Sequence, residues 1–513
     1  MADRDQSKIL IIGLDMGDGN LIRQWAEEGY LPALSRMIKQ GTWADLKTTA
    51  EVLHVSAWPS LYTGTLPGDH GVYYTYQAGK SDQVAKRIGI GQYGKPPIWK
   101  ILDEAGKRCI VMDTPYTFPE EGYNGIQIFE WGTWAWYWKP MAVPAGLWRK
   151  LKSSCGTYPL GYEANQIGLG SLDPQKLRDA LLSSVRTKGA AVQWLLAEYP
   201  WDFAWTVFGE THPAGHYLGD FGSSVSAASQ LGRDVYQAID TAIGKIVDDY
   251  QNNVTLFIVS GDGVGRNYAG WHLLPEILKQ TGYLVDLEKQ PADEIDQPAA
   301  KTQPQKDRLK QLRSLIPRNL REMVSKRLPA ALRDKLMARW AGSEVDWSRT
   351  HAYCLPTDLE GCIRINLRGR EPEGIVEPGE AYRALCDEIA ALISGLVHTK
   401  TGSKAVRAVY KMHETFGGER MDDLPDIVVQ WENDAAIDAL SIPETGITVK
   451  GESPDWRSGT HVPPGFMLAK GGAIFRGQTL SGCHVTDLAP TILKLMDVAV
   501  PTYMKGQVWE EII

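Results

Sequence analysis

The chain has 513 residues, of which 43% are hydrophobic and 23% are charged, and its formal net charge is -8. This composition is typical of a globular protein, and the lack of a basic stripe argues against nucleic acid or an anionic membrane as a partner. We expect neither a signal peptide nor a membrane span. The six cysteines show no Cys-x-x-Cys spacing, so we expect reduced thiols and a cytoplasmic location.

Strands and helices alternate through the first half of the chain. Apolar runs predict buried strands at 8–14, 108–112, 203–208 and 254–260. Amphipathic patterns predict helices at 21–29, 174–197 and 235–250. This alternation indicates an α/β fold with a doubly wound, mostly parallel sheet flanked by helices.

The alternation is interrupted after residue 287. Residues 288–347 are first rich in Gln, Pro, Asp and Ala and then in Lys, Arg and Leu, which predicts a flexible and helical insertion resembling a cap. Further strands are predicted at 361–366, 426–430 and 466–470, with helices at 382–396 and from Asp487. We therefore expect a first core segment at 1–287, the insertion at 288–347, and a second core segment at 348–513.

Two histidines one helical turn apart follow the third predicted strand. His212 and His216 flank Pro213, and residues at i and i+4 share one helix face, so both imidazoles could reach one metal ion. Asp15 and Asp262 also follow predicted strands, and His461 lies in a late loop. Ligands of an open parallel sheet gather at the carboxyl ends of its strands, so we expect these side chains at one edge.

Several motifs make the sequence recognisable. They are Ile11-Ile-Gly-Leu-Asp15, Ala57-Trp-Pro-Ser-Leu-Tyr-Thr-Gly-Thr-Leu-Pro-Gly-Asp-His-Gly71, Gly459-Thr-His-Val-Pro-Pro-Gly465 and Asp487-Leu-Ala-Pro-Thr. With these motifs the chain resembles the alkaline phosphatase superfamily, in particular its type I phosphodiesterase/nucleotide pyrophosphatase-like branch. The resemblance implies the alkaline phosphatase-like α/β fold. It also implies two metal ions, often zinc, bridged by a Ser or Thr nucleophile.

The resemblance carries over to some site residues and fails at others. Asp15, His216 and His461 match metal ligands of the family. At the position of the family's nucleophile this chain has His54. At the position of the aspartate in the family's Asp-x-x-x-His pair it has His212. The family's Ser-Asp-His-Gly reads Ser260-Gly-Asp-Gly263, so one aspartate is missing and Asp262 replaces the usual histidine.

These departures predict two altered ligand sets. His212, His216 and His461 would form an all-histidine site with an open position for water, while Asp15, Asp262 and His54 would form the other. One or two divalent ions are expected, with zinc favoured over iron and manganese. His54 is interpreted as a ligand in preference to a nucleophile, and both roles stay open.

Four further residues complete the predicted site. Glu210 either orients a histidine or is an ordinary carboxylate at a strand end; with His54 it is a candidate for a catalytic role. Trp58, Thr75 and Trp134 are predicted to bind the substrate. Trp134 belongs to a tryptophan-rich loop, which is either an apolar wall of the substrate pocket or a packed aromatic loop without a role in binding.

The favoured function is a metal-dependent hydrolase that cleaves a phosphate, phosphodiester or sulfate ester of a small molecule with metal-bound hydroxide. Two alternatives remain open. One is a non-hydrolytic iron or manganese enzyme, which could use oxygen, on the same fold. The other is an inactive metal-binding protein. The sequence is compatible with a homo-oligomer and does not fix the oligomeric state.

Overall fold

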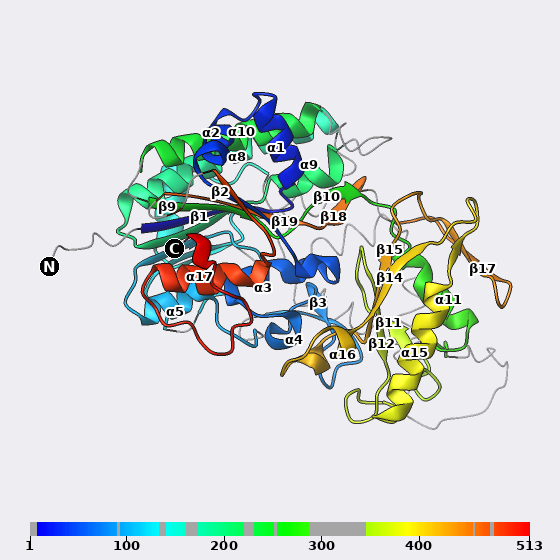
Figure 1. The fold of residues 1–513 in the computed structure, drawn as a ribbon. Helices are drawn as coiled ribbons and strands as arrows, with labels where there is room; N and C mark the ends of the chain where they lie inside the picture. The colour runs from blue at the N-terminus through cyan, green and yellow to red at the C-terminus, as the bar shows by residue number, and fades with distance from the viewer. Residues whose placement is uncertain are drawn as a thin grey trace, which may run out of the picture.

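The computed structural model describes residues 8–89, 93–120, 122–132, 140–160, 173–219, 230–250, 254–287, 345–454, 457–471, 474 and 477–512 (Figure 1). Nearly all of the predicted insertion, residues 288–344, lies outside the described residues. Among the helices that are described, none is both long and apolar enough to cross a bilayer.

A nine-stranded sheet forms the centre of the larger lobe, in the order β20-β2-β19-β9-β1-β8-β5-β6-β7. The pairs from β9 to β6 are parallel, and β19 and β7 are antiparallel to the strands beside them. The predicted doubly wound, mostly parallel sheet is therefore confirmed. The strands span β1 Lys8–Leu14, β2 Thr42–Leu46, β5 Cys109–Met112, β6 Ile126–Phe129, β7 Met141–Val143, β8 Phe203–Phe208, β9 Val254–Ser260, β19 Gly465–Lys470 and β20 Gln478–Leu480.

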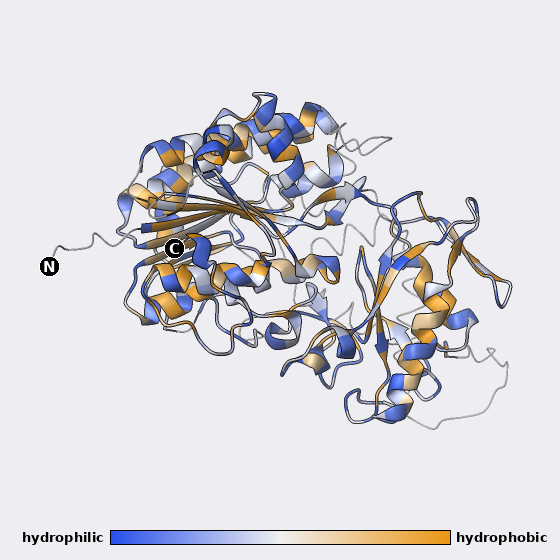
Figure 2. Cartoon of the chain, viewed as in Figure 1, coloured by the Kyte–Doolittle hydropathy of each residue, from blue (hydrophilic) through white to orange (hydrophobic). Residues whose placement is uncertain are grey.

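Helices cover both faces of this sheet (Figure 1). One face is covered by α1 (Gly19–Glu27), α2 (Pro32–Gln40), α6 (Leu147–Cys155), α8 (Pro174–Glu198), α9 (Thr211–Tyr217) and α10 (Gln230–Asp248). The other face is covered by α3 (Ala57–Thr63), α5 (Ile98–Glu104) and α17 (Leu488–Leu495), beside α4 (Pro67–His70). Every residue of β8 and β9 is buried because both faces are covered, which explains their unbroken apolar runs (Figure 2).

A smaller second lobe combines α11, which precedes residue 288, with the strands and helices between Ala352 and Lys450. Its four-stranded sheet has the order β11-β12-β15-β14, and a three-stranded sheet has the order β13-β16-β17. These elements are β11 Ala352–Cys354, β12 Gly361–Ile365, β13 Val397–His398, β14 Val406–Lys411, β15 Ile427–Trp431, β16 Ala439–Ile442 and β17 Ile447–Lys450, with helices α11 Leu274–Gln280, α15 Glu380–Ser394 and α16 Met412–Thr415. They enclose a hydrophobic core of their own.

Residues 348–513, expected to form a second core segment, include most of this lobe as well as the return to the main sheet. The strands between Ala352 and Lys450 join only one another, and the chain returns to the main sheet at β19. The individual elements at 361–366, 382–396, 426–430 and 466–470 are confirmed within two residues. Their order in the sequence gave no sign of a separate sheet, because pairing between strands is a non-local choice. Two further short ladders are β3 (Tyr76–Gln77) with β4 (Lys86–Arg87) and β10 (Gly263–Arg266) with β18 (Gly459–Val462).

A buried histidine in the larger lobe predicts that the protein loses stability in mild acid. His70 is fully buried; its Nδ1 accepts a bond from the Val72 amide at 3.0 Å, and its Nε2 lies 3.1 Å from Ser60 Oγ. Burial lowers the pKa of His70 from 6.5 to about 3. Between these two values the unfolded chain binds a proton that the folded chain does not, so the free energy of unfolding decreases as the pH falls.

At about pH 5 this one group is expected to remove roughly 2 kcal/mol of stability relative to pH 7. Urea unfolding at both pH values measures it, with His70→Gln as the comparison because glutamine does not titrate. The variant should lose about 2 kcal/mol less than the unmutated protein on going to the lower pH. Equal losses in the two proteins would show that His70 does not carry the effect.

Candidate metal centre

The predicted site residues converge where β1, β8 and β9 end. Asp15 directly follows β1, and α9, which carries His212 and His216, begins three residues after β8. Gly261 and Asp262 separate β9 from β10, and β10 pairs with β18 so that Val264 lies opposite His461. The short β10–β18 ladder thus brings the late histidine to the edge formed by the three parallel strands.

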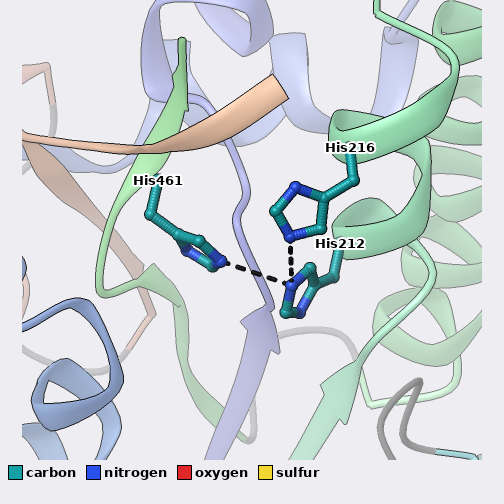
Figure 3. Close-up of side chains that lie close together, drawn as sticks. All are labelled: His212, His216 and His461. Carbon is teal, nitrogen blue, oxygen red and sulfur yellow. Dashed lines mark hydrogen bonds between the residues drawn. The ribbon is translucent and has the colours of Figure 1, made fainter. Parts of the chain in front are cut away.

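Three imidazoles meet at this edge through the same ring nitrogen (Figure 3). Nε2 of His212 lies 2.8 Å from Nε2 of His216 and 3.3 Å from Nε2 of His461. These are the residues that, among those described, form a group with metal-ligand atoms all within 4.8 Å of one another. Zn–N bonds of about 2.0–2.1 Å in a tetrahedral site would place the nitrogens roughly 3.3 Å apart.

The other nitrogen of each ring is held by a hydrogen-bond acceptor. Nδ1 of His212 lies 2.7 Å from Asp15 Oδ2, and Nδ1 of His461 lies 2.7 Å from Asp262 Oδ2. Nδ1 of His216 lies 2.7 Å from the carbonyl oxygen of Gly459. The Gly459 carbonyl can only accept, and the Asp15 and Asp262 carboxyl groups face the other two Nδ1 atoms, an arrangement that favours the Nδ1–H tautomer with a lone pair on each Nε2. Burial raises the pKa of the Asp15 carboxyl.

Three lone pairs at this separation repel one another unless a cation lies between them. Burial, followed by the charge of the neighbouring histidines and Arg457, lowers the pKa of His212 and of His216 well below the usual value. Both imidazoles are therefore neutral at pH 7, which is the form that binds metals. The donor set fits a metal ion, and the carboxylate–histidine pairs are the outer contacts that orient such ligands.

The second predicted ligand set is not assembled in the same way. Both oxygens of Asp15 are engaged, because Oδ1 accepts a bond of 2.8 Å from the indole nitrogen of Trp58. Asp262 keeps one buried oxygen, Oδ1, without a hydrogen bond. In the structure each carboxylate thus contacts the Nδ1 atom of a histidine, and the metal-ligand roles of Asp15 and His54 stay predictions. A metal-ligand role for Asp262 stays a prediction.

Gly261, at the position of the family's missing aspartate, has no room for a side chain. A Cβ atom there would lie 2.7 Å from Cβ of Ala57, at the start of α3. The Gly261 carbonyl is also held by Thr48 Oγ1 at 2.5 Å. A carboxylate side chain at position 261 would therefore clash with Ala57.

We expect Gly261→Ala to lower the free energy of unfolding by about 1–3 kcal/mol, because a well-packed interior has no space for an added methyl group. Urea unfolding measures the loss. The matched control is Gly261→Ala combined with Ala57→Gly, which removes the opposing Cβ and should recover roughly 1 kcal/mol in a double-mutant cycle. Independent, additive effects of the two changes would contradict this contact.

His54 lies beside the three histidines and outside their ligand group. Its ring stacks on that of His461, with centroids 4.6 Å apart and planes at 29°. Its Nδ1 lies 2.8 Å from both carboxylate oxygens of Glu360, which comes from the second lobe. Sequence reasoning missed Glu360, since a lone glutamate before a strand carries no signal for a partner 306 residues away.

The remaining predicted residues lie elsewhere. Glu210 is buried and accepts a bond of 2.9 Å from Tyr158 Oη, and among the described residues no hydrogen bond joins it to a histidine; its catalytic role stays a prediction. Trp58 is buried in the hydrophobic core and donates to Asp15, and its role in substrate binding stays a prediction. Thr75 is buried, and its Oγ1 lies 3.3 Å from Tyr116 Oη. Its role in substrate binding stays a prediction. Trp134 lies outside the described residues.

Comparison with known proteins gives one family match and several similar structures. The chain matches the family described as type I phosphodiesterase / nucleotide pyrophosphatase over residues 9–439. No curated protein matches it by sequence. Murine ectonucleotide pyrophosphatase / phosphodiesterase 5, in an inactive form with AMP, is 15% identical over 96% of both chains, with a TM-score of 0.49. Phosphonoacetate hydrolase from Sinorhizobium meliloti, in complex with phosphonoformate, is 12% identical over 96% of both chains, also with a TM-score of 0.49.

Proposed function

Because this chain belongs to the type I phosphodiesterase/nucleotide pyrophosphatase family, whose members are hydrolytic enzymes of the alkaline phosphatase superfamily, we propose that it hydrolyses a phosphate, phosphodiester or sulfate ester at a single three-histidine metal centre. The observation that carries the proposal is the convergence of three Nε2 atoms whose Nδ1 partners leave them as lone-pair donors. The substrate is proposed to be a small molecule.

The choice of metal follows from the donors. Three imidazole nitrogens and one open position are the ligand set of catalytic zinc sites, so zinc is proposed, with iron and manganese as alternatives. When bound, the metal would lower the pKa of a water ligand from about 15.7 to roughly 7 and so supply a nucleophile at neutral pH. One ion is proposed because the space at Gly261 is closed and both Asp15 oxygens are engaged.

Residues of the chain itself would orient the three histidine ligands. Asp15, Asp262 and the Gly459 carbonyl hold the three rings in the productive tautomer and orientation. An attack by water replaces the covalent step that a Ser or Thr nucleophile would perform. The family's nucleophile position is an imidazole here, and the nearby hydroxyl of Ser56 is buried and donates to the Leu53 carbonyl at 2.6 Å.

The test combines elemental analysis with an ester screen. Protein purified without chelator should contain one zinc per chain, and removing it should abolish hydrolysis of p-nitrophenyl phosphate, bis-p-nitrophenyl phosphate or p-nitrophenyl sulfate. Cobalt substitution should give the intense visible absorption of a tetrahedral site. Iron with oxygen consumption would favour the non-hydrolytic alternative, and a protein that binds metal without turning over any ester would favour the inactive one.

A further inference from the structure

A cavity of about 840 Å³ opens at the amino ends of the parallel strands, on the side of the main sheet opposite the metal centre. Its walls come from the turn before β5, the start of β6, the start of α6 and the turn before β8. The three histidines instead follow the carboxyl ends of the strands, beside β10 and β18 (Figure 1). β8 has six residues, so at about 3.3 Å per residue its two ends lie roughly 17 Å apart. The cavity is therefore separate from the metal centre, and its volume lies within the roughly 300–1,000 Å³ that is usual for small-molecule pockets.

The floor of this cavity is apolar. Ile110 of β5 and Leu147 of α6 line it and are each 3% exposed, and Ile126 at the start of β6 lines it beside them. Tyr199 lines the cavity from the turn before β8, and its ring packs edge-to-face against Trp194 with the centroids 5.8 Å apart. Such a floor would remove the apolar body of a ligand from water.

The rim of the cavity is basic. Two cations come from the turn before β5 and two from α6, against one acidic side chain; the five residues are Lys107, Arg108, Arg149, Lys150 and Asp103. Arg108 is paired with Asp202, whereas among the described residues no salt bridge engages Arg149 or Lys150. The whole chain carries a net charge of -8, so four cations around one cavity do not follow from its composition.

The two cations of α6 stand where the helix itself disfavours them. Arg149 and Lys150 are the third and fourth residues of this helix, whose first turn has no acidic residue and no side chain that caps it. The amino end of a helix carries a partial positive charge, so cations there raise the energy of the protein and a bound anion would lower it. The placement of these cations therefore suits a ligand better than it suits the free helix.

We propose that this cavity binds an organic dianion, a phosphate or phosphonate group attached to an apolar or aromatic body. The charged group would lie between Arg149 and Lys150 on α6 and Lys107 on the facing turn, and the body would cover Ile110 and Leu147. A guanidinium matches the geometry of a phosphate through two parallel hydrogen bonds, and three cations suit two negative charges better than one. The cavity shares no lining residue with the three-histidine group, so binding here would not require the metal.

The probe that tests this site is naphthylmethylphosphonate, which has no ester bond for a hydrolase to cleave. Isothermal titration calorimetry of the protein as purified measures its affinity. Naphthylmethanol has the same rings without the charge, and inorganic phosphate has the charge without the rings. Each should bind at least about 10-fold more weakly than the phosphonate, because each loses one half of the contacts. An alcohol or a free phosphate that binds as tightly as the phosphonate would overturn the proposal.

Charge reversal on α6 locates the binding. Arg149→Glu combined with Lys150→Glu should weaken phosphonate binding by at least about 10-fold. The helix should stay folded in this variant, since acidic residues are favourable in a first turn, and circular dichroism checks this. The matched control is Lys176→Glu with Lys245→Glu, which changes the net charge equally at exposed positions of α8 and α10 outside the cavity and should leave the affinity unchanged.

Two further variants separate this cavity from the metal centre. Asp103→Asn should strengthen phosphonate binding several-fold, because it removes the one acidic side chain of the rim; the Oδ2 atom of Asp103 also accepts from the Asn124 amide, which an asparagine oxygen can replace. His216→Ala should bind the phosphonate as the unmutated protein does. Binding that survives the charge reversal on α6, or that is lost in His216→Ala, would overturn the proposal and assign the anion to another place.

Discussion

Replacing His216 with Ala is expected to lower zinc affinity by at least about 100-fold and to abolish ester hydrolysis. A structural zinc site contributes roughly 10–16 kcal/mol of binding free energy shared among four ligands, so one ligand is worth about 3 kcal/mol. His216 is fully buried and its Nδ1 is held by the Gly459 carbonyl, so its ring is fixed with Nε2 toward His212. Competition with a chromophoric chelator measures the affinity.

The chain offers a matched control in His272. Its Nε2 also bonds a carbonyl oxygen, that of Gly451 at 3.1 Å, but it lies outside the three-histidine group. His272→Ala should keep both zinc and activity. Asp15→Asn should give an intermediate result, about 10–100-fold weaker binding, because it alters an orienting contact and keeps the ligand. Full zinc content and full activity in His216→Ala would remove the basis of the metal centre.

Lys188→Met is expected to lower the free energy of unfolding by about 3–5 kcal/mol. Lys188 is fully buried in the middle of α8, and its Nζ lies 2.8 Å from Asp113 Oδ2, which is also fully buried. Nζ also donates to the carbonyls of Val207 and Gly132, at 2.7 and 3.1 Å. Methionine would leave the Asp113 carboxylate charged and unpaired in the interior, which is the costly way to break a buried ion pair.

Removing both charges of the Lys188–Asp113 pair separates the effect of an unpaired buried charge from the effect of lost packing. Lys188→Met combined with Asp113→Asn should recover part of the stability, since asparagine removes the uncompensated charge, tolerates the left-handed backbone at position 113 and can still accept from the Trp131 amide. Urea unfolding of the two single variants and the double variant gives the coupling energy. A double variant no more stable than Lys188→Met would assign the loss to the two carbonyls that Lys188 satisfies.

Much of the fold and part of the site could be predicted because the signals are local. The unbroken apolar run at 203–208 marks a strand buried on both faces, and His212 and His216 share a helix face by spacing alone. His461 was predicted from its motif, and the structure brings all three imidazoles together. The parallel sheet then requires that Asp15 and α9 meet at one edge.

The amino-acid sequence by itself determined which imidazoles and carboxylates reach the ends of the strands. Only the tertiary structure decided what each of them does there. Trp58 and the β10–β18 ladder set the side-chain directions of Asp15 and Asp262, and one oxygen of each carboxylate meets a histidine Nδ1 atom. Glu360 reaches His54 because two lobes pack together, and contacts between segments some 300 residues apart depend on the docking of whole folded units, which no local pattern encodes.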